Sequence, residues 1–356
     1  MADEGGSSFL HNAQLLGSVF TETMHRIGLF RNIISEDGAG LRRLGNFYLN
    51  QDWQRVQEEG RRLFGKNWPE PKKDWQYHDM LPLVFLMAYH PLLIGEWFPR
   101  FVKEWNDFLS SNKVRLPEQR SFAERVLADG RVGDLQRLVL ERFDFMATHK
   151  SALLAAIPAE LYEEGMEKAI AELRLPRDDF DVLKGHYVDC YELAHRVLSI
   201  IVGTINVVER GHQDSFDATI CAALAANRMN NFKNVPTLTA FAERPNGPKR
   251  AFLKSTPVCE QMWDALLDRE LRNAVGHYSA RHDLRTGSII VDAKSHCSYL
   301  EFVVKTIRMT HVLLCLLHVL KMCHMQKVVT NPAPAAAKAV TTKSSKNRIK
   351  KRKPKK

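Results

Sequence analysis

The segment from Arg272 to His277 contains the residue types best suited to chemistry on a phosphate ester. Arg272 carries a planar guanidinium that stays charged at physiological pH and matches the geometry of phosphate oxygens. His277 titrates near neutrality and can therefore move a proton. Asn273 follows the arginine directly, and Gly276 precedes the histidine, where a glycine lets the chain turn. Such a turn would bring the guanidinium and the imidazole toward one point, which favours phosphate-ester chemistry.

A structural role for the same residues is the alternative. Arg272 can be a cation at a helix end, where it complements the helix dipole. On an unbroken helix five positions turn about 500°, so the arginine and the histidine would point about 140° apart. In that case Asn273 is a helix cap, His277 is a loop histidine, and neither takes part in catalysis.

Further positive charges lie where an RNA backbone can contact them. Arg281, His282 and Arg285 follow the segment closely; they either hold phosphate near His277 or form a solvated loop. A basic run near the end of the chain can bind RNA phosphates without sequence preference, serve as an import signal in a host with a nucleus, or only keep the protein soluble. We favour RNA binding for this run, which contains Lys350, Lys351, Arg352 and Lys353.

The net charge of +10 is confined to the end of the chain. Residues 331–356 contain ten Lys and Arg residues and no Asp or Glu, so residues 1–330 are formally neutral. We expect this tail to be disordered, because it has too few apolar residues to offset the entropy lost on ordering. The globular part has no general basic surface, and any attraction for phosphate in it must be local.

Metal sites are only weakly indicated. The histidines and cysteines of the last predicted helix lack a CxxC or HExxH pattern. An acidic group is typical of a helix amino terminus, where it complements the dipole; it consists of Asp178, Asp179 and Asp181. We expect no metal ion and no cofactor.

The first residues of the chain and the pattern of cysteines indicate in which cellular compartment the protein is found. Asp3 and Glu4 stand where a signal peptide would carry basic residues, and the six cysteines form no CxxC pair. The longest apolar stretch, residues 312–320, is about half the ~20 residues that a membrane-spanning helix needs. We expect a cytoplasmic protein that is not inserted into a membrane.

Apolar periodicity predicts helices along most of the chain. In the first half they cover residues 9–34, 50–64, 78–92, 96–110, 117–128, 132–148 and 158–174. In the second half they cover about 187–208, 214–228, 258–272 and 297–325, with a short hairpin near 284–294. We predict an all-α protein with a helical domain over 1–175, a four-helix bundle over 176–328 and a basic tail over 329–356.

With these elements around it, the segment from Leu271 to His277 resembles the Rx4–6H motif of the HEPN superfamily (higher eukaryotes and prokaryotes nucleotide-binding). Many bacterial members place such a motif after an amphipathic helix and before a polar hairpin and a long apolar closing helix. The corresponding parts here are residues 281–295 and 297–325. The resemblance covers about residues 180–325, and residues 1–175 resemble no family that we recognise.

The resemblance implies a metal-independent endoribonuclease. Arg272 would stabilise charge on the scissile phosphate, Asn273 would orient the site, and His277 would transfer a proton at the ribose 2′-OH or the leaving oxygen. Because one histidine does not easily act as both base and acid, the family's solution of pairing two motifs in a homodimer is implied as well. A defence or stress effector, in which residues 1–175 sense a trigger or restrain cleavage, fits this activity.

A second hypothesis is a non-catalytic helical scaffold that uses a degenerate bundle for dimerisation or RNA binding. The two hypotheses predict different geometries. A nuclease requires Arg272 and His277 of two protomers to face one accessible cleft. Separate salt bridges for these side chains would favour the scaffold.

Overall fold

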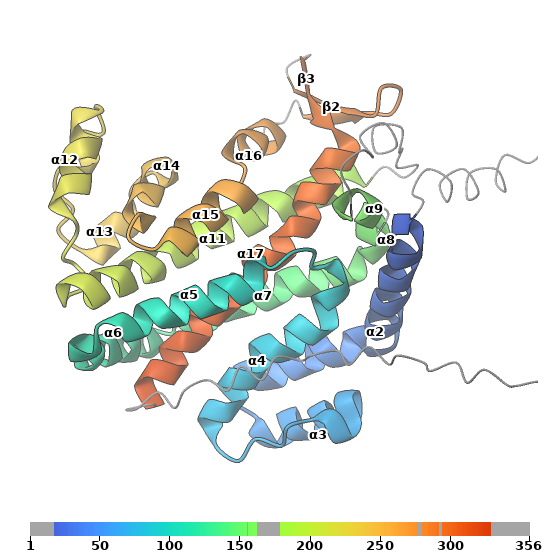
Figure 1. Ribbon diagram of the computed structural model, residues 1–356, viewed down its shortest axis with the longest axis horizontal. Coiled ribbons are helices and arrows are strands. Elements are labelled where there is room, and N and C mark those ends of the chain that lie inside the picture. Colours follow the sequence, from blue (N-terminus) through green and yellow to red (C-terminus); the bar gives the residue numbers. More distant parts are fainter. Residues whose placement is uncertain (1–17, 155, 162–178, 277–279, 292–293, 329–356) are drawn as a thin grey trace, which may run out of the picture.

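The protein is described by a computed structural model that covers residues 18–154, 156–161, 179–276, 280–291 and 294–328. Helices dominate these residues, and one small sheet accompanies them (Figure 1). The prediction of an all-α fold with a short hairpin is confirmed. The predicted disorder of the tail concerns residues outside the described ones.

The first half of the chain forms a succession of helices close to the predicted ones. They are α2 (Ser18–Leu49), α3 (Trp53–Phe64), η1 (Gly65–Asn67), α4 (Asp74–Tyr89), η2 (His90–Leu92), α5 (Trp97–Ser111), η3 (Lys113–Arg115), α6 (Leu116–Ala128), α7 (Arg131–Thr148), α8 (Lys150–Leu154) and α9 (Ile157–Glu160). Most of the helix predicted over 158–174 lies outside the described residues. Among the described helices the main difference is α2, which we predicted to end at residue 34. It continues through Gly40, where a Cβ would lie 2.4 Å from Leu63 Cδ2, so the glycine lets α3 pack closely.

The second half contains two long helices and several short ones. They are α11 (Phe180–Arg210), α12 (Ala218–Ala226), η4 (Asn230–Phe232), α13 (Leu238–Ala242), α14 (Asn246–Lys249), η5 (Arg250–Leu253), α15 (Pro257–Leu266), α16 (Arg269–Gly276) and α17 (Tyr299–Val328). The predicted helix over 258–272 is divided into α15 and α16. Asp268 begins the second of them, because its Oδ1 accepts the backbone N–H of Leu271 (2.8 Å).

The sheet follows α16 and contains three antiparallel strands in the order β1 (Arg281–Asp283), β2 (Ser288–Val291) and β3 (Lys294–Ser298). The prediction was a two-stranded hairpin, with residues 297 and 298 in the last helix. Instead, Ile289 faces Cys297 across the β2–β3 ladder. In the first turn, Asp283 accepts the backbone N–H of Arg285 (3.1 Å) and the hydroxyl of Thr286 (3.0 Å).

Helix α17 lies at the centre of the core. It packs against α4, α6 and α7 of the first half and against α11 of the second (Figure 1). The buried apolar residues of both halves form one continuous cluster. The predicted division near residue 176 stays a prediction. By length and composition, α11 and α17 could each cross a membrane, which our sequence argument did not anticipate. In each, 89% of the most apolar window is buried, as expected for core helices.

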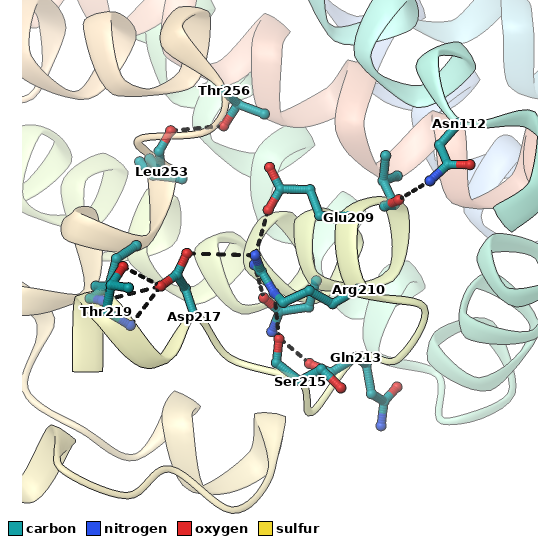
Figure 2. A network of polar contacts seen from close by, with 12 residues as sticks. Asn112, Glu209, Arg210, Gln213, Ser215, Asp217, Thr219, Leu253 and Thr256 are labelled. Atoms are coloured by element: carbon teal, nitrogen blue, oxygen red, sulfur yellow. Dashed lines mark hydrogen bonds and ion pairs between the residues drawn. The ribbon is translucent and has the colours of Figure 1, made fainter. Parts of the chain in front are cut away.

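A polar network fixes the far end of α11, where the chain turns into α12 (Figure 2). Arg210 donates from Nε to the carbonyl oxygen of Ser215 (2.6 Å) and from Nη2 to Asn206 Oδ1 (2.8 Å). Asp217 caps α12 by accepting the backbone N–H of Thr219 (2.8 Å). The end of α11 and the start of α12 therefore both have hydrogen-bond partners from neighbouring side chains.

Close packing of α11 gives a prediction about stability. A Cβ on Gly203 would lie 2.6 Å from Leu238 Cδ2 and 2.7 Å from Phe122 Cζ. We expect Gly203→Ala to lower the free energy of unfolding by about 1–3 kcal/mol through overpacking. Gly185 lies in the same helix with nothing within 4 Å of its Cβ position, so Gly185→Ala should raise that free energy by about 0.5–1 kcal/mol. Urea denaturation measures both, and equal changes would contradict this account.

Candidate functional site

Arg272 and Asn273 lie in the middle of α16, not at the end of a helix as predicted. The described part of the helix runs through Gly276, and Leu271 and Val275 on its inner side are buried. The helix packs against α11 (Figure 1). His277 lies outside the described residues, so its predicted approach to the arginine remains a prediction.

The guanidinium of Arg272 forms an ion pair with Glu192 of α11. Its Nη2 donates to Glu192 Oε1, and its Nη1 lies 3.4 Å from Asn273 Oδ1. Its Cζ lies 5.9 Å from the ring centre of Tyr191, a cation–π contact. The Arg272 side chain remains 34% exposed, so solvent reaches a guanidinium whose orientation is set from three sides.

Two residues of α14 extend this arrangement. Asn246 donates from Nδ2 to Glu192 Oε2 (3.3 Å) and accepts from the Nζ of Lys249 (3.0 Å). Lys249 is buried and also donates to the carbonyl oxygen of Ala242 (2.7 Å). Burial lowers the pKa of Lys249 from its usual range, although the negative charge of Glu192 acts in the opposite direction. We call Tyr191, Glu192, Asn246, Lys249 and Arg272 the Glu192 cluster.

Two further arginines, Arg250 and Arg269, lie beside this cluster. Arg269 lies against Gly247, where a Cβ would be 3.5 Å from the Arg269 Cζ. Arg250 pairs with Asp264 at 2.8 Å. Burial raises the pKa of Tyr191, and the nearby Arg272, Arg269 and Arg250 oppose that shift, so all three guanidinium groups act on this phenol. Within the described residues, Arg272 pairs with Glu192 and Arg250 pairs with Asp264, whereas Lys249 and Arg269 form no ion pair.

A histidine lies one helical turn beyond the cluster. His195 stacks on the Tyr191 ring at 4.6 Å, and its Nδ1 donates to the carbonyl oxygen of Tyr191 (3.0 Å). Burial lowers the pKa of His195 below its ordinary value. The imidazole is therefore neutral at pH 7, and its Nδ1 carries the proton.

The predicted substrate-binding residues form two groups, one in or beside the small sheet and one outside the described residues. Arg281 is an exposed residue of β1, and Arg285 is exposed in the turn that follows. His282 is half-buried and stacks on Tyr299, with ring centres 4.2 Å apart. Within the described residues, no hydrogen bond or ion pair joins Arg281 or Arg285 to Arg272. Both β1 and α16 pack against α11. The basic run of Lys350, Lys351, Arg352 and Lys353 lies outside the described ranges.

The predicted absence of a metal remains an expectation. Over the ranges that the structure describes, no three His, Cys, Asp or Glu side chains gather as metal ligands. The α17 histidines have core environments: His318 Nε2 lies 3.1 Å from Asn106 Oδ1, and burial lowers the pKa of His311 to about 4. At the start of α11 only Asp179 and Asp181 are described.

Sequence reasoning missed Glu192 and Lys249. Glu192 lies 80 positions before Arg272, so no local pattern connects them. Tyr191 and Leu193 on either side of Glu192 are buried. This places Glu192 at the edge of a buried surface but does not identify its partner.

Comparison with models of protein families, with curated proteins and with solved structures finds no match to this chain. The motif and the geometry of the Glu192 cluster therefore carry the functional argument.

Proposed function

We propose that this protein binds RNA and cleaves it without a metal ion, with Arg272, Asn273 and His277 as catalytic residues. The anchoring of Arg272 is the observation that carries this proposal. Glu192 and Tyr191 hold its guanidinium in place, and one third of the side chain stays open to solvent. A guanidinium has five N–H donors, so donors remain for phosphate oxygens, and its orientation is set before RNA arrives.

The proposed reaction is an internal transesterification. A base removes the proton of a ribose 2′-OH, the 2′ oxygen attacks the adjacent phosphorus, and the bond from phosphorus to the 5′ oxygen breaks. An acid returns a proton to that leaving oxygen, so the products are a 2′,3′-cyclic phosphate and a 5′-OH. Arg272 would stabilise the additional charge on the phosphate oxygens. His277 would transfer the protons, with a second copy of the chain supplying the second histidine.

The charge around the site supports a polyanionic substrate. Of the cations Lys249, Arg250, Arg269 and Arg272, two pair with carboxylates and two form no ion pair within the described residues, although residues 1–330 are formally neutral. Arg281 and Arg285 are exposed on the sheet that follows α16, where they would bind the RNA backbone further along. We place the protein in the cytoplasm, as an effector whose first 175 residues respond to a trigger.

A specific observation also favours the non-catalytic scaffold. Glu192 already neutralises the positive charge of Arg272 within the chain. A salt bridge of this kind is what the scaffold hypothesis predicts for Arg272. The scaffold hypothesis predicts a separate salt bridge for His277 as well, and that residue lies outside the described ones. In a scaffold the same cationic surface would bind RNA or a second protomer without cleaving anything.

An RNA cleavage assay in EDTA tests the proposal. We expect the wild-type protein to cleave single-stranded RNA with EDTA present and to leave a 2′,3′-cyclic phosphate, identified by mass spectrometry of the fragments. Activity that disappears in EDTA and returns with Mn²⁺ or Mg²⁺ would contradict the mechanism. RNA that is bound but left intact would favour the scaffold.

A further inference from the structure

A second site lies at the far end of α17 from the Glu192 cluster. A cavity of about 550 Å³ opens where α3, α4 and α7 begin and where α6 and α17 end. Proteins bind drug-sized molecules in cavities of about 300–1,000 Å³. The cavity is lined by side chains from both halves of the chain, among them His78 of α4 and His324 of α17. Their imidazole rings stack nearly parallel, with centres 3.8 Å apart.

A chain of hydrogen bonds sets the proton positions on these two rings. Gln136 Nε2 donates to the Tyr48 hydroxyl oxygen (3.2 Å). The buried Tyr48 O–H has no acceptor other than His78 Nδ1 within the described residues, so we assign it as the donor to that nitrogen (2.7 Å). The Oε1 of the same Gln136 lies 3.4 Å from His324 Nε2 and accepts its proton. Tyr48 and Gln136 are both buried, so water does not compete with this chain. His78 is therefore protonated on Nε2 and His324 on Nε2.

The remaining ring nitrogens form a matched pair. His78 Nε2 is a donor, and His324 Nδ1 is an acceptor. Neither atom has a hydrogen-bond partner within the described ranges, and neither is among the buried polar atoms. Both residues line the cavity.

Both rings are neutral at pH 7. Burial lowers the pKa of His78 to about 4 and that of His324 to about 3, and the positive charge of Lys327 adds to both shifts. The other charged groups at the cavity are the exposed carboxylates of Asp74 and Glu124. A metal ion is a poor occupant, because lone pairs in two nearly parallel rings do not converge on one point.

We propose that this cavity binds a nucleoside whose base pairs with His78 and His324. Every nucleobase has a donor and an acceptor side by side on its Watson–Crick edge, which matches one imidazole N–H beside one bare imidazole nitrogen. Neutral rings favour a neutral polar group over a carboxylate or a phosphate. Trp53 also lines the cavity. Tyr77 covers one face of its ring (4.7 Å), and the ring stands perpendicular to that of His78 (5.6 Å, 89°), so Trp53 offers the base an additional aromatic contact.

The charged side chains at the rim of the cavity fit the ribose and the phosphate of a nucleotide. Asp74 and Glu124 can accept hydrogen bonds from ribose hydroxyls. Lys327 can pair with one phosphate at the 5′ position. Glu124 is paired with Arg120 (3.0 Å), so Asp74 is the carboxylate that would repel a longer phosphate chain. A nucleoside or its monophosphate should therefore bind better than a triphosphate.

Titration calorimetry of the full chain tests this site, with adenosine, guanosine, cytidine and uridine as probes. We expect at least one nucleoside to bind and its 5′-triphosphate to bind more weakly. His324→Phe keeps an aromatic ring but removes the acceptor, so it should weaken binding roughly tenfold. No binding of any nucleoside to the wild type would overturn the proposal. Ribose 5-phosphate binding as tightly as the nucleoside would do the same, because the base would then not be recognised.

A matched pair of glycine variants locates the binding. Gly133 lines the cavity in α7, and nothing lies within 4 Å of its Cβ position. Gly28 is an equally unobstructed helical glycine in α2 and does not line the cavity. Gly133→Leu should weaken binding by placing a side chain in the cavity, whereas Gly28→Leu should leave it unchanged. Equally tight binding in Gly133→Leu and Gly28→Leu would place the nucleoside elsewhere. Neither glycine contributes to the Glu192 cluster, so this result is independent of RNA cleavage.

Discussion

Arg272→Ala and His277→Ala are each expected to lower the rate of RNA cleavage at least about 100-fold, since positioned acid–base groups and charge-stabilising donors commonly contribute that much. The fold should survive both changes. Arg272 is one third exposed, and an ion pair of that exposure contributes only about 0–1 kcal/mol to stability. Single-turnover cleavage measures the rate, and circular dichroism checks that the helices remain.

Two further variants separate the chemistry from a general loss of charge. Arg100→Ala removes an exposed arginine that pairs with Glu104 on α5 (2.7 Å), and it should leave the rate unchanged. Glu192→Ala leaves the charge of Arg272 but removes its anchor, so it should slow cleavage less than Arg272→Ala does. If Arg272→Ala cleaves as fast as Arg100→Ala, the arginine has no catalytic role.

A mixed dimer extends this test to the assembly. If each protomer supplies one histidine to a shared site, a dimer of wild type and His277→Ala should be inactive or severely impaired. A mixed dimer that keeps half of the wild-type rate would mean that each protomer acts alone. The measurement uses two affinity tags to purify the mixed species before the cleavage assay.

The sequence predicted the long helices well, because their apolar residues recur with helical spacing over many turns. It failed where a distant contact decides the local structure. The division between α15 and α16 is one case. Leu266, Leu267 and Leu271 continue the apolar pattern, but Asp268 caps α16 and pairs with Lys305 of α17 at 2.8 Å. A partner 37 positions away cannot be identified from local periodicity.

The candidate site shows the same limit. Its motif could be recognised because Arg272 and Asn273 are adjacent in the sequence. The carboxylate that anchors the arginine comes from a different helix, and Glu192 has no feature in the sequence that pairs it with Arg272. The stacked histidines are a stronger example. His78 and His324 lie in opposite halves of the chain, and only the packing of α17 against α4 brings them together.

Deleting the tail is expected to change the affinity for RNA strongly and to leave the cleavage chemistry unchanged. Deleting residues 331–356 removes ten positive charges. Each cation that neutralises an RNA phosphate releases a counterion, so the slope of log K against log salt for single strands changes by about 0.7 per contact. We expect the deletion to weaken binding and to flatten this slope by up to about 7. The unfolding temperature should stay nearly unchanged, because the tail has few apolar residues to bury.

A graded variant makes the tail test quantitative. Replacing Lys350, Lys351, Arg352 and Lys353 by glutamine removes four charges and keeps the length of the chain. Its salt slope should fall by up to about 3, less than half of the change caused by the deletion. Binding is measured by fluorescence anisotropy with a labelled single-stranded RNA at several salt concentrations. Equal slopes for the wild type and the deletion would show that the tail does not contact RNA. The few cations at the Glu192 cluster would then have to supply all of the electrostatic attraction.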